Sequence, residues 1–417
     1  MLRTHSIIAL FAAGAALAGT ARAQRALTWE EVRDRFEASN PTMRAARIGI
    51  EESRAQGITA NLRPNPDLTF GLDQLDPFTV NPYQPFAETL PLVSASYLHE
   101  REHKRELRLE SARKGTAVTV SQTADQERNL LFTLRGAFVQ ALQAKAVLAL
   151  ARENLTYYDH VLAVSNDRFK AGDIARVDLD RLELQRVQYE SDVQTGEVNM
   201  RTAKIQLLAL LNERTPVEQF DVAGAFEFRE PVVNLEELRK AALAERPDLR
   251  AAEQAVDKAK TDYRLAVANG STDPTFGVDF GRNPPIPVYM GVSVNIPLRI
   301  FDRNQGEKAR TQLDIARNER LREAAEAQVF SDVDSAWATL TSGLVLLRSY
   351  KARYLQQAAS VRDTISFAYQ HGGASLLDFL NAQNDSRAVQ VAYLNLVGAY
   401  LNAANQLNLA VGREVIL

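Results

Sequence analysis

The sequence predicts a mainly α-helical protein with a membrane β part, built from two tandem repeats. Each repeat is expected to hold two β-strands and one very long coiled-coil helical hairpin. Prolines occur only from Pro41 to Pro91 and from Pro216 to Pro297, which leaves two long proline-free stretches. A glycine near the middle interrupts each stretch, at Gly172 and at Gly372. Such stretches permit unusually long helices, and the glycines predict that each folds back on itself.

The first residues have the order of a secretory signal peptide. A single charge at Arg3 precedes an apolar run from Ile7 to Ala18, and Ala21-Arg22-Ala23 resembles a cleavage site. The run is too short to span a bilayer as a helix. We therefore predict that residues 1–23 are a signal peptide cleaved during Sec export.

Composition restricts the protein class further. The chain has no cysteine, so we expect no disulfide, no thiolate metal site, no cysteine nucleophile and no lipid anchor. No window of the mature chain is apolar enough for a transmembrane helix, so a membrane part would consist of strands. A formal net charge of -3 without a basic stripe argues against nucleic acid as a partner.

Each repeat is expected to begin with two short helices. Capping-box spacing marks the start of the first helix, and a proline at the first helical position marks the second. The capping pairs are Thr28 with Glu31 and Asn234 with Glu237, and the prolines are Pro41 and Pro247.

Strands are predicted where apolar residues alternate with small or polar ones, over residues 68–73, 276–281 and 288–296. A fourth strand near residues 86–97 alternates poorly. This pattern suits a transmembrane barrel and equally a half-buried sheet of a soluble protein. Because known membrane barrels begin at about eight strands, four strands per chain would require several chains to form one barrel.

The first hairpin should start with a helix from about residue 98 to residue 171, roughly 110 Å long. A helix this long needs partner helices along its length, and apolar residues at heptad spacing predict coiled-coil packing. Ordinary amphipathic helices on one core remain the alternative. The heptad positions are Leu179, Leu182, Tyr189, Val193, Met200, Leu207 and Leu211 in the first return helix, and Tyr393, Val397, Tyr400, Ala404, Leu407 and Val411 in the second.

The two halves of the chain are copies of each other. Pro41 aligns with Pro247, and residues 69–71 align with 275–277 as Thr-Phe-Gly in both. A period of this length indicates two structural halves and excludes a solenoid. We predict a first repeat over residues 24–215 and a second over residues 216–417.

These segments carry a resemblance to the TolC family of outer-membrane factors. It covers essentially the whole mature chain. The similar segments are Asn40-Pro41 with Arg44-Ala45-Ala46, residues 62–66 (LRPNP), residues 297–306 (PLRIFDRNQG), and the hairpin tips at residues 169–179 and 369–378. The segment over residues 297–306 is most similar to the branch that serves heavy-metal cation pumps of the cobalt-zinc-cadmium type.

The resemblance implies a non-enzymatic homotrimer without cofactors. Its twelve strands would form one β-barrel in contact with outer-membrane lipid, and its helices a twelve-helix α-barrel across the periplasm. It would be the channel of a tripartite efflux pump, joined by a periplasmic adaptor to an inner-membrane pump. The substrates would be heavy-metal cations or small toxic compounds. A duct for type I protein secretion shares every one of these structural features, differs only in its partner and substrate, and remains an alternative.

The resemblance also implies a gate at the hairpin tips. Tyr369 matches a tyrosine that bonds an aspartate of the other hairpin, here Asp178, and Asp378 matches an acid that rings the entrance. A bond of this type is worth about 1.5–3 kcal/mol, weak enough for a docking partner to break. The alternative is that Asp178 and Asp378 merely favour helix starts.

The tip sequence departs from the family pattern at Ala374, where a basic residue is expected, and at Asn381, where a second acid is expected. Three carboxylates of Asp378 in a trimer would still attract cations. The residues expected to contact the adaptor are Gly172, Asp173, Gly372 and Gly373.

One short segment of the chain matches an enzyme signature. Residues 99–103 read His-Glu-Arg-Glu-His, the pattern of the helix in zinc peptidases. The run is charged at nearly every position, and the matching segment of the second repeat lacks both histidines. A solvated helix start is therefore favoured over a zinc peptidase that uses His99, Glu100 and His103, or over adventitious surface metal binding.

Overall fold

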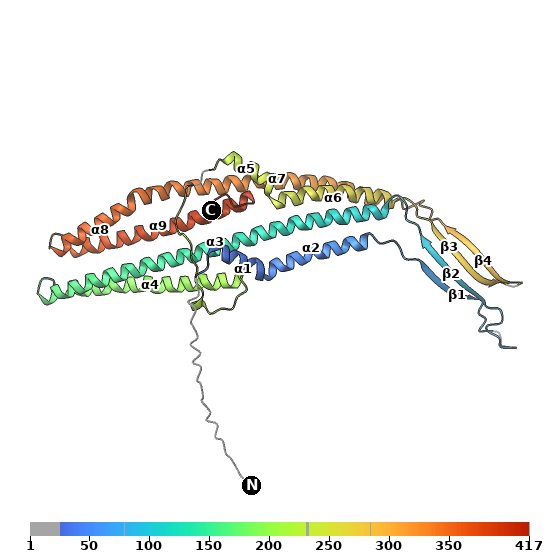
Figure 1. Cartoon of the computed structure of the whole chain (residues 1–417), viewed down its shortest axis with the longest axis horizontal. Coiled ribbons are helices and arrows are strands. Elements are labelled where there is room, and N and C mark those ends of the chain that lie inside the picture. Colours follow the sequence, from blue (N-terminus) through green and yellow to red (C-terminus); the bar gives the residue numbers. More distant parts are fainter. Residues whose placement is uncertain (1–25, 79, 231–232, 284, 417) are drawn as a thin grey trace, which may run out of the picture.

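The computed structural model describes residues 26–78, 80–230, 233–283 and 285–416. The predicted signal peptide lies outside these residues. The molecule is an elongated shaft with a β-sheet at one end and two helical hairpin tips at the other, while the carboxyl end lies near the middle (Figure 1). The predicted class, mainly α-helical with a small β part, is confirmed.

The same order of two short helices, two strands and a long hairpin occurs twice along the chain. The elements of the first half are α1 (Trp29–Ser39), α2 (Pro41–Ala60), β1 (Asp67–Asp73), β2 (Leu90–Leu98), α3 (Lys104–Lys170) and α4 (Arg176–Leu210). Those that follow are η1 (Val217–Gln219), α5 (Leu235–Glu245), α6 (Pro247–Asn269), β3 (Thr275–Asn283), β4 (Ile286–Asn295), α7 (Gln305–Ser349), the π-helical turn η2 (Tyr350–Tyr354), α8 (Leu355–Gln370) and α9 (Leu376–Val411).

The short helices start where the sequence predicts, with one difference in capping. Thr28 and Glu31 form the complete capping box, and prolines occupy the first positions of α2 and α6. The expected box of Asn234 with Glu237 is wrong. The Asn234 side chain accepts its bond from the N–H of Glu236 instead, at 3.0 Å, so this helix has a simple cap.

Each hairpin turns at a glycine in the left-handed region, Gly172 with φ of 86° and Gly372 with φ of 76°. All seven predicted heptad positions of the first return helix are buried, six in α4 and Leu211 directly after it, and those of α9 are buried apart from the half-buried Tyr393. The helix expected from residue 98 begins only at Lys104. Strand β2 continues through Leu98, and a turn with His103 in the left-handed region follows it.

The described interior has three apolar clusters, two near the middle of the shaft with Phe226 packed against both, and one at the tips. One lies around Phe36 and Leu207 in the first half, and one around Leu340 and Leu407 in the second. The third, around Tyr158, lies at the tips and takes residues from both hairpins. The tips therefore pack on each other through side chains of both halves.

The four strands form one antiparallel sheet in the order β1-β2-β3-β4. Its register aligns Phe70, Val93, Phe280 and Met290 in one row, all exposed. The alternate row on the opposite face is Thr69, Ser94, Asp279 and Gly291. The sheet thus has one continuous apolar face without a protein covering and one face of small and polar residues.

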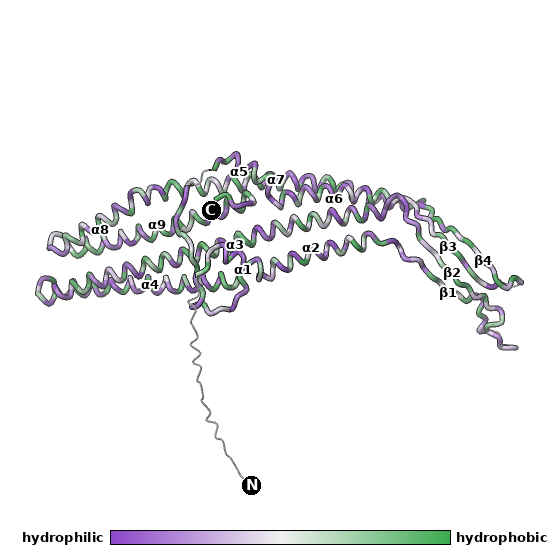
Figure 2. Tube along the Cα trace, in the orientation of Figure 1, coloured by the Kyte–Doolittle hydropathy of each residue, from purple (hydrophilic) through white to green (hydrophobic). Residues whose placement is uncertain are grey.

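Hydrophilic and hydrophobic residues are mixed along the long helices (Figure 2). None of the helices in the described ranges is long and apolar enough to cross a membrane.

Candidate functional site

The two hairpin tips lie side by side at one end of the shaft (Figure 1). Backbone bonds close each turn, from Asp173 N–H to the Arg168 carbonyl at 2.9 Å and from Gly373 N–H to the Ala368 carbonyl at 2.7 Å. Gly172, Asp173, Gly372 and Gly373 are exposed. The turn residues are therefore open to a partner, and their contact with an adaptor stays a prediction.

An aromatic core lies directly behind the turns. Tyr158 stacks on Tyr189 at 4.5 Å between ring centres, and its hydroxyl donates to the Leu182 carbonyl at 3.0 Å. Tyr369 stacks on Phe379 at 4.9 Å. These rings come from α3, α4, α8 and α9, so the core joins the two hairpins.

Tyr369 is where the sequence places it, in the interface between hairpins, but its predicted hydrogen bond to Asp178 is not formed in the described chain. The Tyr369 hydroxyl is buried and has no hydrogen-bond partner. Burial raises the pKa of the Tyr369 phenol, the nearby Arg168 opposes the rise, and the charge of Asp178 adds to it. The Tyr369 ring packs on Phe379, and Asp178, the third residue of α4, is half-buried and makes no hydrogen bond to the Tyr369 hydroxyl.

Asp378 closes a capping box at the start of α9. Its carboxylate accepts from the Ser375 hydroxyl at 2.7 Å and from the Ser375 N–H at 3.2 Å, and the Ser375 hydroxyl accepts from the Asp378 N–H at 3.1 Å. The bonds from Ser375 hold the pKa of Asp378 below its usual range. Asp378 is exposed and charged, and it serves the helix start that was its alternative role.

Polar contacts that the sequence did not predict join the hairpins instead. Arg387 in α9 donates to Asp192 in α4 at 2.5 Å, and Gln185 donates to Asn384 at 3.2 Å. The sequence contains one signal for such contacts. The otherwise apolar buried face of α9 includes polar residues, and buried polar residues need hydrogen-bond partners. One of them, the buried Gln383, donates to the Ser366 hydroxyl at 3.0 Å.

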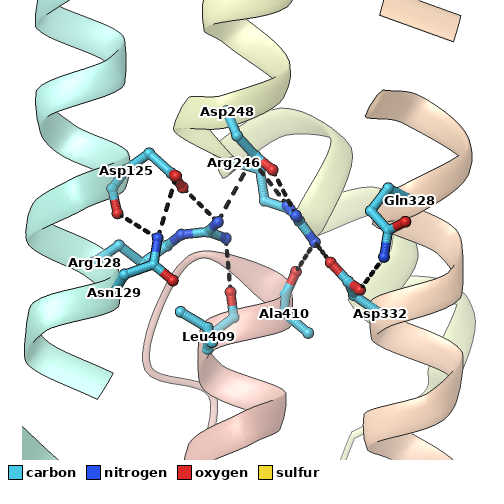
Figure 3. Close-up of polar contacts among 9 residues, drawn as sticks. All are labelled: Asp125, Arg128, Asn129, Arg246, Asp248, Gln328, Asp332, Leu409 and Ala410. Atoms are coloured by element: carbon cyan, nitrogen blue, oxygen red, sulfur yellow. Dashed lines mark hydrogen bonds and ion pairs between the residues drawn. The ribbon is translucent and has the colours of Figure 1, made fainter. Parts of the chain in front are cut away.

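A second polar centre lies near the middle of the shaft, at the end of α9 (Figure 3). Arg246 is almost fully buried and donates two bonds to Asp248, at 3.0 and 2.6 Å. It also donates to Asp332 in α7 at 2.8 Å and to the Ala410 carbonyl at 3.3 Å. Bidentate pairing of this kind is among the stronger hydrogen bonds of proteins.

Arg128 of α3 completes this centre from the first half. It donates to the Leu409 carbonyl at 2.8 Å and lies 3.6 Å from the carboxylate of Asp248 (Figure 3). Arg128 and Arg246, here called the arginine clamp, thus cap two carbonyls at the negative end of α9. The clamp joins α3 of the first repeat to α6, α7 and α9 of the second.

The segment with the zinc-peptidase pattern does not form the required helix. Residues 99–103 lie in the turn between β2 and α3, and Glu100 pairs with Arg108. Two histidines one helical turn apart are needed to bind zinc together. No group of three side chains suited to holding a metal ion occurs in the described part of the chain.

Comparisons with known proteins agree with this architecture. Residues 238–413 match the family model described as outer membrane efflux protein. The cobalt-zinc-cadmium resistance protein CzcC of Cupriavidus metallidurans is 23% identical, over 93% of this chain and 90% of its own. The outer membrane efflux protein BepC of Brucella suis is 24% identical over 69% of this chain, which spans 64% of that relative's length.

Solved structures share the fold. A structure of CusC superposes with a TM-score of 0.77 and 18% identity, covering 92% of both chains. The open state of the Neisseria gonorrhoeae MtrE outer membrane channel gives a TM-score of 0.76 and 18% identity, covering 93% of this chain and 89% of that one.

The tandem strand-and-hairpin fold, with its exposed apolar sheet and paired tips, is shared with solved outer membrane channels, and the similar curated proteins are outer membrane efflux and resistance proteins. The family model covers residues 238–413, less than half of the chain, and the likeness to CzcC extends over 93% of it, so the chain is similar to this family of outer membrane efflux proteins. Members of this family are channels and not enzymes.

Proposed function

We propose that three copies of this chain form an outer-membrane channel that conducts substrates from a periplasmic adaptor and an inner-membrane pump to the exterior. The observation that carries the proposal is the sheet at the end of the shaft. Its apolar face is open, with Phe70 73% and Val292 80% exposed. Such a face suits lipid, while the row with Thr69 and Asp279 suits a water-filled interior.

Ring closure follows from the sheet edges. Among the residues that the structure describes, β1 and β4 each lack a strand partner on one side, although strand edges inside a membrane need one. Pairing β4 of one copy with β1 of the next repeats the same contact around an axis. Three copies then supply twelve strands, the number that the family resemblance implies.

The helical shaft carries a matching contact surface. Val177, Leu184, Val198 and Ile205 are exposed and recur at heptad spacing along α4, away from its buried face. A second apolar stripe on a helix that is already packed on one side favours a further helical neighbour. We assign this stripe to the neighbouring copy.

Assembly tests this assignment. Val198→Arg places a charge in the stripe and should convert the detergent-purified trimer into monomers, measured by light scattering after size exclusion. Asn199→Arg, at an exposed position beside the stripe, is the control and should stay trimeric. A trimeric Val198→Arg protein would show that the stripe lies outside the contact between copies.

We further propose heavy-metal cations as the substrate, because the likeness to CzcC extends over 93% of this chain. Deletion of the protein should then sensitise cells to cobalt, zinc and cadmium salts. Sensitivity to organic compounds alone would favour a drug pump, and a lost secreted protein would favour the type I secretion duct. Copurification with the adaptor, weakened by Asp173→Lys at the exposed tip, would support docking there.

The proposed route to the outer membrane begins with cleavage after Ala23. Amino-terminal sequencing of protein from outer-membrane fractions should read Gln24 first, without a lipid modification. The helices would then extend into the periplasm, and the proposed repeat boundary between residues 215 and 216 lies between α4 and η1.

A further inference from the structure

Three arginine–tyrosine pairs cross between the two hairpins near their tips. In each pair the guanidinium carbon of one hairpin lies 5.3 to 5.4 Å from the centre of a tyrosine ring of the other. These distances are within the range of cation–π contacts. The pairs are Arg168 of α3 with Tyr369 of α8, Arg387 of α9 with Tyr189 of α4, and Arg362 of α8 with Tyr157 of α3.

We propose that these three stacks hold the hairpins of one chain together, and that at Tyr369 the ring, not the hydroxyl, keeps the tip closed. The inference rests on the proposed channel function and names the contacts that would resist opening. A cation over an aromatic face is strengthened when water is excluded. The side chains of Arg387 and Arg362 are only 22% and 23% exposed.

Tyr369 shows most clearly why the ring carries the contact. Its hydroxyl is buried without an acceptor and so makes no bond that opening would break. Its ring, in contrast, is covered by Arg168 on the other hairpin and stacks on Phe379. Arg168 also donates to the backbone carbonyl of Tyr369 at 3.3 Å.

Other bonds hold the arginines in place. Arg387 donates to Asp192, three residues from the ring it covers, and Arg362 pairs with Asp363 at 2.8 Å. A guanidinium that is bonded at its edge keeps its flat face free for an aromatic ring. The stacks are thus supported by bonds of the same guanidinium groups.

The residues of the three pairs are not repeated at the equivalent positions of the other repeat. When the tips of the two repeats are aligned at Gly172 and Gly372, Phe169 stands at the position of Tyr369, Val389 at that of Tyr189, and Gln357 at that of Tyr157. None of the arginines has a basic counterpart either. All three pairs lie where the first hairpin meets the second.

The test compares ring and hydroxyl at one position, using the full chain assembled in planar bilayers. Tyr369→Phe keeps the ring and should leave the closed-state conductance unchanged, whereas Tyr369→Leu removes the ring and should raise it about fivefold. Arg168→Gln should match Tyr369→Leu, and Asp178→Asn should match the wild type. If Tyr369→Phe raised conductance as much as Tyr369→Leu, the hydroxyl would be the closing group and the proposal would be overturned.

Hydrogen exchange of the detergent-solubilised proteins provides a readout that does not need a conducting channel. Tyr369→Leu and Arg168→Gln should speed exchange in residues 155–190 and 362–390, while Tyr369→Phe should not. If exchange were unchanged in both Tyr369→Leu and Arg168→Gln, the proposal that the stacks hold the hairpins together would be overturned. A wild type that never conducts, with exchange changed as expected, would instead count against the channel function alone. If Tyr369→Leu does not assemble, Arg387→Gln combined with Arg168→Gln takes its place.

Discussion

The return helices α4 and α9 end at equivalent positions of the two repeats. Different side chains bond the last carbonyls of the two helices. At the end of α4, the Ser39 hydroxyl donates to the Leu211 carbonyl at 2.7 Å and the Asn40 amide donates to the Leu210 carbonyl at 3.0 Å. At the end of α9, the arginine clamp makes the equivalent bonds. Asn40 and Arg246 are each the residue before the proline that begins α2 or α6, so one duplicated position performs the same task in both repeats.

The two helix ends differ in which other parts of the chain they are bonded to. The bonds of Ser39 and Asn40 stay within the first repeat and involve neutral groups. Arg246 instead reaches Asp248 and Asp332 in its own repeat, and Asp248 lies beside Arg128 of the first. The clamp therefore fixes the two halves to each other midway along the shaft, whereas the tips are joined mainly by rings and single polar bonds. Motion at the tips is then expected to leave the middle of the shaft unchanged.

The largest expected effect comes from removing the central arginine. Arg246→Ala removes the buried cation that pairs with Asp248 and Asp332 and leaves the Ala410 carbonyl without its bond, and because Arg128 and Gln328 still contact the two carboxylates we expect a loss of about 3 kcal/mol of unfolding free energy. Guanidinium unfolding followed by circular dichroism measures the loss. Arg413→Ala removes a mostly exposed arginine whose ion pair to Glu245 spans 3.7 Å, and it should change stability by less than about 1 kcal/mol. Equal losses in the two variants would mean that the clamp is only a surface pair.

The equivalent change in the first repeat should cost less. Asn40→Ala removes one neutral hydrogen bond to Leu210 and the side-chain cap of α2, together about 1–2 kcal/mol. The same denaturation experiment compares it directly with Arg246→Ala. If Asn40→Ala lost as much unfolding free energy as Arg246→Ala, the ionic contacts at the end of α9 would not be stronger than the neutral ones at the end of α4.

The long elements of this fold were predictable because their signals are local and repeated. Prolines, tip glycines and heptads locate both hairpins, and alternation locates the strands. The break of the second long helix by η2 has no such signal, and the start of α3 was misplaced because β2 continues through Leu98. Short polar patterns were the least reliable, since the pattern at residues 99–103 forms a turn and not a zinc-binding helix.

The candidate site was only partly predictable, because its contacts are tertiary. Arg246 two residues before Asp248 resembles an ordinary solvated pair in the sequence, and nothing local shows that α7 and α9 close around it. At the tips the sequence correctly placed Tyr369 at the contact between hairpins. It named the wrong partner, because the position of Arg168 over the ring depends on how two distant helices pack.

The smallest expected effect is the response of the two helix ends to acid. Burial by itself raises the pKa of Asp248, but the hydrogen bonds from Arg246 outweigh this and hold the pKa below its ordinary value of 3.8. A carboxyl with a lowered pKa stabilises the folded state above that ordinary value, and the stabilisation is lost as pH falls through the folded-state pKa. At the end of α4 the groups that bond the helix carbonyls, Ser39 and Asn40, are neutral, and the nearby Glu213 pairs with Arg35 and not with a capping residue. Between pH 6 and pH 3, amide exchange corrected for its intrinsic pH dependence should therefore accelerate at the end of α9 and not at the end of α4. Asp248→Asn should abolish the difference, because its uncharged amide cannot gain a proton in this range. Equal acceleration at both ends of the wild type would mean that acid loosens the shaft as a whole, and that the ionic clamp does not set its acid sensitivity.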